Sequence, residues 1–195
     1  SGQHTRLESF DSQSGKLVSS QSIYEQNRIE MHPSQNRIYR IEMSGSPITM
    51  GTYSITNGVL ASEVRSPYHG TYSVSTELTL SPDGKYIFNG AGFIFRSSMT
   101  ASADMKYYGQ LDREYTSIAF DTEYGEFYTA NQKNYIQTYD YVTMEPLDQI
   151  STYGNIQKMF YNQQHDTLLI FSTVKLGSSS VAFTGIEKVY YDVEM

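Results

Sequence analysis

Leu80-Ser-Pro-Asp-Gly-Lys-Tyr-Ile-Phe88 is the clearest of four versions of one short unit, and this repeat decides the fold. Each version has an apolar residue, then a polar turn, then a run of residues that favour β-strands. The other versions are Met31-His-Pro-Ser-Gln-Asn-Arg-Ile-Tyr39, Phe120-Asp-Thr-Glu-Tyr-Gly-Glu-Phe-Tyr128 and Tyr161-Asn-Gln-Gln-His-Asp-Thr-Leu-Leu169. Equivalent positions should share one environment. We therefore expect burial of two sets: Met31, Leu80, Phe120 and Tyr161, and Ile38, Ile87, Phe127 and Leu168.

The spacing of the four units indicates stacked sheets. Their first residues lie 49, 40 and 41 positions apart. A period in the forties is typical of β-propellers, in which each blade is one four-stranded sheet. The chain is therefore predicted to be all-β and of the propeller type, as a single domain over residues 1–195.

A second marker recurs with the same period. Asp11-Ser-Gln-Ser-Gly15 is typical of a polar turn that ends in a glycine with positive φ. Gly15 and Gly58 are 43 residues apart, and a third turn of this kind is expected near Ala101. The related segments are Tyr53-Ser-Ile-Thr-Asn-Gly58, Tyr139-Asp-Tyr-Val-Thr-Met144 and Ala182-Phe-Thr-Gly185.

We expect each blade to begin with the strand that follows this turn. In the third unit the four predicted strands are residues 106–109, 116–120, 126–130 and 135–141. The chain then starts on a fourth strand at residues 5–10 and ends on a first strand at residues 186–193. This gives about four four-stranded blades plus half a blade split between the termini. Either the end strands meet and close a small ring, or the chain is part of a larger ring, which we favour because propellers usually have more blades.

Composition supports β-structure and narrows the class of partner. The 195 residues include 18 Tyr and 9 Phe, and aromatic residues suit a pleated, half-buried surface. The net charge of -7, with Lys and Arg scattered, argues against nucleic acid, which requires a clustered basic surface. No apolar run approaches the ~20 residues needed to cross a bilayer, so no membrane insertion is expected.

The sequence has no Cys, which excludes disulfides, thiolate zinc ligands and a thiol nucleophile. A chain without Cys fits both a cytosolic protein and an exported bacterial protein. Ser, Thr, Tyr, Asn and Gln are abundant, and this composition favours export, with an extracellular or cell-surface location.

Two motifs together resemble a known repeat. Asp11-x-x-Ser-Gly15 followed by a strand, and the Ser81-Pro-Asp-Gly84 hairpin, are similar to the repeat of bacterial YVTN-type β-propellers and to modules of large secreted bacterial surface proteins. The resemblance covers nearly the whole chain at low identity, and only the second unit matches the hairpin well. It implies a seven-bladed ring, export and a binding role. Lactonases and propellers of some dehydrogenases share the fold, but no catalytic motif of theirs has a match here.

No catalytic set is evident. The four histidines are His4, His32, His69 and His165, and none forms a zinc-type pair. His32 and His165 occupy equivalent hairpins, where we expect both to be solvated. The turn carboxylates lack EF-hand spacing, so we interpret them as caps of their own backbone rather than calcium ligands. A Ser/His/Asp triad stays open, because triads are recognised by geometry. We assign no catalytic residue, no metal site and no cofactor.

One loop departs from the regular repeat. Gly58 and Leu80 are 22 residues apart, against 16 and 17 in the first and fourth units, and the excess falls in Ser66-Pro-Tyr-His-Gly-Thr-Tyr72. We expect this loop between the first and second strands of its blade, on the face opposite the glycine turns. Tyr68, His69 and Tyr72 are the candidate binding residues, because they offer two phenol rings and an imidazole on a bent loop. The alternative is that the two tyrosines fold back over the blade edge.

These observations favour a non-catalytic binding or spacer module of an exported bacterial surface protein, in contact with protein or glycan. The alternative is part of a propeller hydrolase or lactonase-like enzyme with its site at the central channel. An enzyme is the less favoured hypothesis, because no catalytic set was found.

Overall fold

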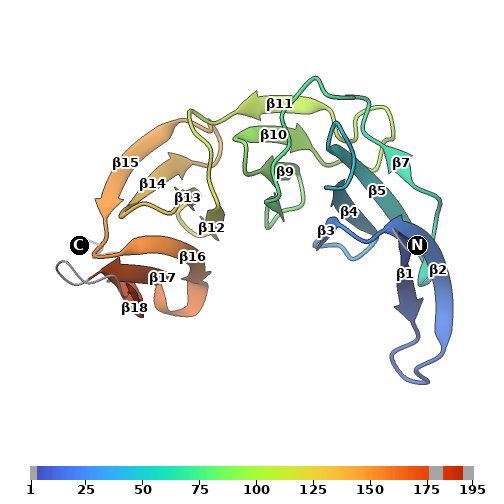
Figure 1. The fold of residues 1–195 in the computed structure, drawn as a ribbon, viewed down its shortest axis with the longest axis horizontal. Helices are drawn as coiled ribbons and strands as arrows, with labels where there is room; N and C mark the ends of the chain where they lie inside the picture. The colour runs from blue at the N-terminus through green and yellow to red at the C-terminus, as the bar shows by residue number, and fades with distance from the viewer. Residues whose placement is uncertain (1–3, 176–181, 191–195) are drawn as a thin grey trace. The chain divides into compact units, whose positions relative to one another are not determined.

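The computed structural model describes residues 4–175 and 182–190, and this part of the chain is all-β, as predicted (Figure 1). The only helical element of the described part is one 3₁₀ turn, η1 (Gln163–His165). The strands pair in antiparallel sheets. The chain divides into two compact units, Ser1–Gln110 and Leu111–Met195.

The first unit holds three sheets. A hairpin forms the two-stranded sheet β1–β2, and the next sheet has the order β3-β4-β5-β6, with β7 also paired to β5. The third sheet has the order β8-β9-β10-β11. The bounds are β1 (His4–Phe10), β2 (Leu17–Tyr24), β3 (Asn27–Met31), β4 (Arg37–Glu42), β5 (Thr49–Thr56), β6 (Val59–Leu60), β7 (Val64–Arg65), β8 (Leu78–Leu80), β9 (Tyr86–Asn89), β10 (Phe93–Arg96) and β11 (Tyr107–Gln110).

The second unit holds two sheets. The first has the order β12-β13-β14-β15, and the second has three strands in the order β16-β17-β18. The bounds are β12 (Ser117–Asp121), β13 (Glu126–Ala130), β14 (Tyr135–Asp140), β15 (Pro146–Ser151), β16 (Asn155–Asn162), β17 (Thr167–Lys175) and β18 (Ala182–Tyr190).

The register confirms that the four repeat units are equivalent. Each forms the hairpin between the first and second strands of a sheet. The apolar first residue pairs in every case with the second-strand residue that the repeat predicts. The pairs are Met31 with Ile38, Leu80 with Ile87, Phe120 with Phe127, and Tyr161 with Leu168. Each turn contains one residue with positive φ, namely Gln35, Gly84, Gly125 and Asp166.

The second marker is confirmed at three of its predicted turns and located at a fourth. Gly15, Gly58 and Met144 have φ of 67°, 79° and 62°, although methionine pays a steric penalty there that glycine does not. The turn expected near Ala101 lies between β10 and β11, with Met105 at φ 55°. The prediction for Gly185 is wrong, because this residue lies within β18 and pairs with Ser172. A glycine in a strand interior carries no turn signal of its own.

The grouping of strands into sheets differs from the prediction by one strand. The strand after the second marker pairs with the strand before it, as β10 pairs with β11, and so it ends one sheet rather than beginning the next. The reason is that a tight turn folds its two flanking strands into a hairpin. The end strand predicted at residues 186–193 is the third strand of its sheet over residues 182–190, and residues 191–193 lie outside the described residues.

Each unit contains its own core between successive sheets. Ile38, Ile87, Phe127 and Leu168 are buried, as the repeat predicts, with at most 8% of their surface exposed. Leu80 is buried, whereas Phe120 and Tyr161 are half-buried. Met31 is 47% exposed, so its predicted burial is wrong. In the described part of the chain the preceding sheet has only β1 and β2, which contact mainly β6, and this leaves Met31 on the inner strand β3 exposed.

Candidate binding surfaces

The irregular loop is an inter-sheet connection. Residues 66–77 join β7 to β8, the first strand of the next sheet. The prediction that the loop lies between two strands of one blade is wrong, because the strand before it, β7, belongs to the preceding sheet. Antiparallel strands alternate in direction, so the loop reaches β8 at the end opposite the β8–β9 hairpin. The predicted face is therefore the observed one.

The structure brings Tyr68 and Tyr72 together. Their ring centroids are 4.8 Å apart in a T-shaped arrangement, and the Tyr72 ring stacks on Tyr107 at 4.8 Å and an angle of 5°. The backbone N–H of Tyr107 donates to the phenol oxygen of Tyr68 at 3.1 Å. Both loop tyrosines are half-buried against the core of the first unit, and Tyr72 also meets Phe93 and Phe95 edge-on. His69, between them in sequence, is exposed.

This packing defines an aromatic cluster of Tyr68, Tyr72, Phe93, Phe95 and Tyr107. Edge-to-face and offset-stacked rings are the arrangements that aromatic pairs favour. Burial, followed by the nearby Tyr68 and Tyr107, raises the pKa of Tyr72, so its phenol stays neutral at physiological pH. Sequence reasoning missed Tyr107, whose only signal was the Tyr107-Tyr108 doublet in the strand after the third turn.

The aromatic cluster has a solvent-facing side. Tyr107 is 38% exposed, and the Lys106 ammonium lies 6.0 Å from the Tyr68 ring centroid. The loop bends sharply at Gly70, which has a φ of 74° and passes close to Pro47. The cluster therefore anchors the loop at both tyrosines and leaves His69 and one edge of Tyr107 accessible. The binding role of Tyr68, His69 and Tyr72 stays a prediction.

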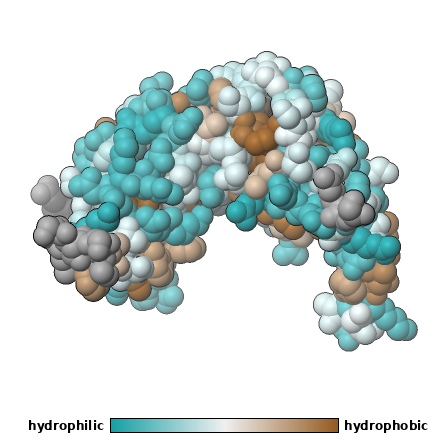
Figure 2. Space-filling view, in the orientation of Figure 1, coloured by the Kyte–Doolittle hydropathy of each residue, from teal (hydrophilic) through white to brown (hydrophobic). Residues whose placement is uncertain are grey.

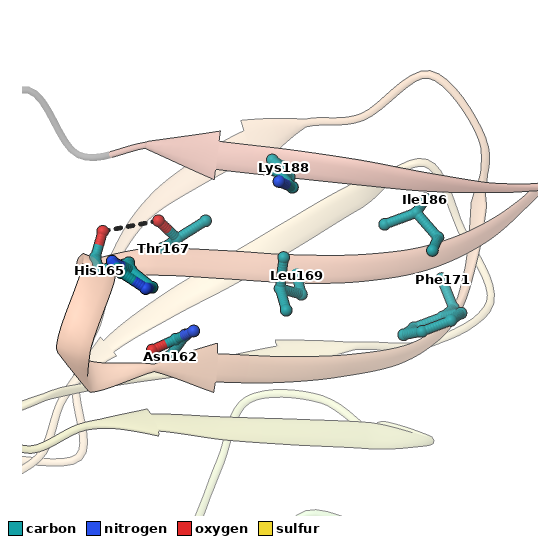
Figure 3. Close-up of a pocket in the computed structure, with 7 residues that line it drawn as sticks. All are labelled: Asn162, His165, Thr167, Leu169, Phe171, Ile186 and Lys188. Atoms are coloured by element: carbon teal, nitrogen blue, oxygen red, sulfur yellow. Dashed lines mark hydrogen bonds between the residues drawn. The ribbon is translucent and has the colours of Figure 1, made fainter.

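A second surface is a pocket of about 550 Å³ on the last sheet. In Figure 2, apolar residues show at the surface of this region, and Figure 3 shows the pocket over β16, β17 and β18. Thr167, Leu169 and Phe171 alternate along β17 and so share one face of the sheet. The pocket is lined by Asn162, His165, Thr167, Leu169, Phe171, Ile186 and Lys188.

Leu169, Phe171 and Ile186 form the apolar part of the pocket lining. Its ionisable side chains are those of His165, at one end beside the turn, and Lys188, which lies across from Leu169 on β18. The hydroxyl of Thr167 donates to the backbone carbonyl of His165 at 2.7 Å, which fixes the turn rather than a ligand. Within residues 4–175 and 182–190, no group of three or more His, Asp and Glu could hold a metal ion.

His32 is not the solvated turn residue that the sequence predicts. Its Nδ1 lies 2.6 Å from the Ser34 hydroxyl, and its Nε2 lies 2.9 Å from the carbonyl oxygen of Gly84. The ring therefore links the β3–β4 hairpin to the β8–β9 hairpin. His165, at the equivalent hairpin of the last sheet, is exposed.

The turn carboxylates Asp11, Asp83, Asp121 and Asp140 cap their own backbone, as predicted, whereas Asp166 accepts from the Tyr161 hydroxyl. One oxygen of Asp140 accepts from the backbone N–H groups of Val142 and Thr143, at 3.0 and 2.6 Å. These bonds, the backbone bond from Thr143 first, hold the pKa of Asp140 below its usual value. Asp11 accepts in the same way from Ser14, which likewise lowers its pKa. Carboxylates satisfied by a turn in this way are structural.

Comparison with solved structures shows a β-propeller. The chain superposes on "Kuenenia stuttgartiensis Hydrazine Synthase" with a TM-score of 0.69 and 9% identity, over 95% of this chain and 56% of that one. It matches "Crystal structure of RRP9 WD40 repeats" with a TM-score of 0.53 and 11% identity, over 75% and 48% of the two chains. It matches "Structure of U3-55K" with a TM-score of 0.54 and 10% identity, over 84% and 54%.

These likenesses show the fold alone, because all three identities are low. The chain spans about half the length of the solved structures it matches. No protein-family model and no curated protein sequence matches it. In the part of the chain that the structure describes, no helix is long and apolar enough to cross a membrane.

Proposed function

We propose that this propeller is a non-catalytic binding or spacer module of an exported bacterial surface protein with YVTN-type repeats, and that it contacts protein or glycan. One observation carries the proposal: an all-β scaffold presents an irregular loop whose tyrosines are held by stacking and a backbone hydrogen bond. Pre-positioned aromatic side chains lose little entropy on binding, which favours contact with a partner.

The contact surface would consist of His69 and the exposed edge of Tyr107. Tyr68 and Tyr72 support it from beneath, because both pack on the core of the first unit. An exposed aromatic edge and an imidazole each suit the apolar face of a sugar ring or a peptide side chain. A propeller with WD40 repeats is among the structural matches, and this likeness in fold supports a binding or scaffold module.

Export is supported by composition. Ser, Thr, Tyr, Asn and Gln are abundant, which favours export, whereas the absence of Cys fits both an exported and a cytosolic protein. The alternative, a lactonase-like hydrolase, receives no specific support from the described residues. The pocket on the last sheet has two titratable lining residues, His165 and Lys188, beside Asn162, Thr167, Leu169, Phe171 and Ile186.

The test uses the four histidines as probes. The ring signals of His69 and His165 would be followed by NMR while soluble chito-, cello- and malto-oligosaccharides, and then the protein's other domains, are added. We expect a shift at His69 and none at His165, which is exposed in the second unit and serves as the control. The variant His69→Ala should weaken binding at least about tenfold without lowering the urea midpoint. The variant Tyr107→Ser should also weaken binding, and it should lower the midpoint because it removes the ring that stacks on Tyr72.

Binding that is unchanged in both variants would overturn the assignment of this loop. Loss of binding in His165→Ala instead would move the site to the last sheet. If none of the added oligosaccharides and domains shifts any histidine signal, the module is a spacer and has no binding role.

A further inference from the structure

Each sheet has two faces, which the repeat register allows us to compare. We call the face that packs on the next sheet in sequence the downstream face, and the opposite one the upstream face. In the first unit Tyr39, Ile41 and Met50 form the downstream face of the β3–β6 sheet and pack on Leu78, Leu80 and Ile87. In the second unit Tyr128, Ala130 and Ile136 of the β12–β15 sheet pack on Ile156, Met159 and Leu168.

The last sheet has the same downstream face, and no element of the described part of the chain packs on it. Leu169 and Phe171 stand one and three residues beyond Leu168, as Tyr128 and Ala130 stand beyond Phe127. Phe171 pairs with Ile186, as Ile41 pairs with Met50. Ile41 and Met50 are 0% and 4% exposed, whereas Phe171 and Ile186 are 36% and 63% exposed.

Phe160 on β16 repeats this contrast. It pairs with Leu169 on the same face and is 51% exposed, whereas its equivalent Ala119 is 6% exposed. The pocket in Figure 3 is therefore the downstream face of the last sheet, seen without a neighbour. Exposed apolar side chains that share one face, here beside Lys188 and with Asn162 and His165 at one end, are typical of a surface that another protein element covers.

The upstream face of the β3–β6 sheet is uncovered at its inner strand. Ile29 and Met31 on β3 are 50% and 47% exposed. Their equivalents on β8, Leu78 and Leu80, are 8% and 6% exposed, because the second strand of the preceding sheet covers them. Before β3 the described chain supplies only β1 and β2, which occupy the positions of the third and fourth strands of a blade.

We propose that both surfaces are covered by further sheets of the same repeat, supplied by the same polypeptide. A following sheet, with an apolar upstream residue at the position that Leu168 occupies in the last sheet, would pack on Phe160, Phe171 and Ile186. A first and a second strand would pair with β1 and cover Ile29 and Met31. The solved structures that the chain matches are about twice as long as the part it covers, which is the length such sheets need.

A second copy of the chain is a poorer occupant. β18 is the third strand of its sheet, and β1 is also a third strand. One blade has a single third position, so the ends of two copies cannot complete a shared sheet unless β1 or β18 is displaced. Further repeats complete both sheets without displacing either strand.

The absence of Cys in the chain permits a direct test. Ile186→Cys and Ile29→Cys would report the two surfaces, and Val142→Cys, at a position 78% exposed in the β14–β15 turn, would be the control. Alkylation by a maleimide would be followed by mass spectrometry in the 195-residue chain and in the complete polypeptide that the gene encodes. We expect similar rates for all three thiols in the chain, and about 100-fold slower reaction of the first two in the complete polypeptide.

Alkylation of Ile186→Cys and Ile29→Cys at the control rate in the complete polypeptide would overturn the proposal. So would a gene that encodes no further repeats. Slow alkylation in the 195-residue chain itself, relieved by dilution and matched by a dimer mass in light scattering, would identify a second copy instead. Hydrogen exchange of the β18 amides needs no substitution: slower exchange in the complete polypeptide supports a fourth strand, and equal exchange contradicts it.

Discussion

The link that His32 makes between the β3–β4 and β8–β9 hairpins can be tested with Gly84→Ala. Gly84 has a φ of 71°, and a Cβ placed there would lie 2.5 Å from Nε2 and 2.6 Å from Cε1 of His32. The left-handed conformation alone costs an alanine about 1 kcal/mol. Because His32 is held by Ser34 on its other side, its ring must leave and give up the contact with the Gly84 carbonyl, at about 1 kcal/mol more. We expect a total loss of about 2 kcal/mol.

Gly125→Ala is the matched control. Gly125 occupies the equivalent hairpin turn with a φ of 70°, and an added Cβ there has nothing within 4 Å. It should therefore lose only the conformational part, about 1 kcal/mol. Urea unfolding followed by circular dichroism would give each free energy of unfolding, and a double-mutant cycle with His32→Ala would isolate the contact. The reasoning is refuted if Gly84→Ala costs no more than Gly125→Ala, or if removal of the imidazole leaves their difference unchanged.

Three further predictions concern burial, ionisation and the turns. Phe127→Ala should cost about 3–5 kcal/mol, because the ring is fully buried and stacks on Tyr139, whereas Phe160→Ala should cost under about 1 kcal/mol in the same urea assay. Burial, and then the hydrogen bond to Asp104, raises the pKa of Tyr39 from 10.0 to about 12, so its contribution to stability is complete below pH 10 and is lost as the pH rises to about 12. Tyr39→Phe should flatten that alkaline decline in urea midpoints, and an unchanged slope would contradict the assignment. Asp140→Ala should speed hydrogen exchange of the Val142 and Thr143 amides, whereas equal exchange would show that the cap does not hold this turn.

The first hairpin of each sheet could be predicted from the sequence because its determinants are local. Apolar residues on either side of a polar turn must lie on one face, so Leu80 and Ile87 had to pair in this register. The second marker was harder to recognise where glycine is absent. Met105 and Met144 adopt positive φ because the surrounding hairpin requires it, and side-chain identity gives no sign of this.

The candidate site was predicted only in part. The length of the loop and its tyrosines identified it, but its partners Phe93, Phe95 and Tyr107 come from strands 20 or more positions further along the chain. His32 was misinterpreted for the same reason, since its contact with Gly84 spans 52 residues. Contacts of this range depend on how two sheets are placed, which local patterns do not encode.

The sequence by itself determined the all-β repeat, its period near 40 residues and the register of the first hairpin in each sheet, because turn chemistry and apolar alternation act over a few residues. Only the tertiary structure decided which strand ends each sheet and which repeated positions are buried. Ile41 and Phe171 occupy the same place in the repeat, yet one is 0% and the other 36% exposed. The difference lies in the neighbouring sheet, because burial depends on what packs against a side chain as well as on its own position in the strand.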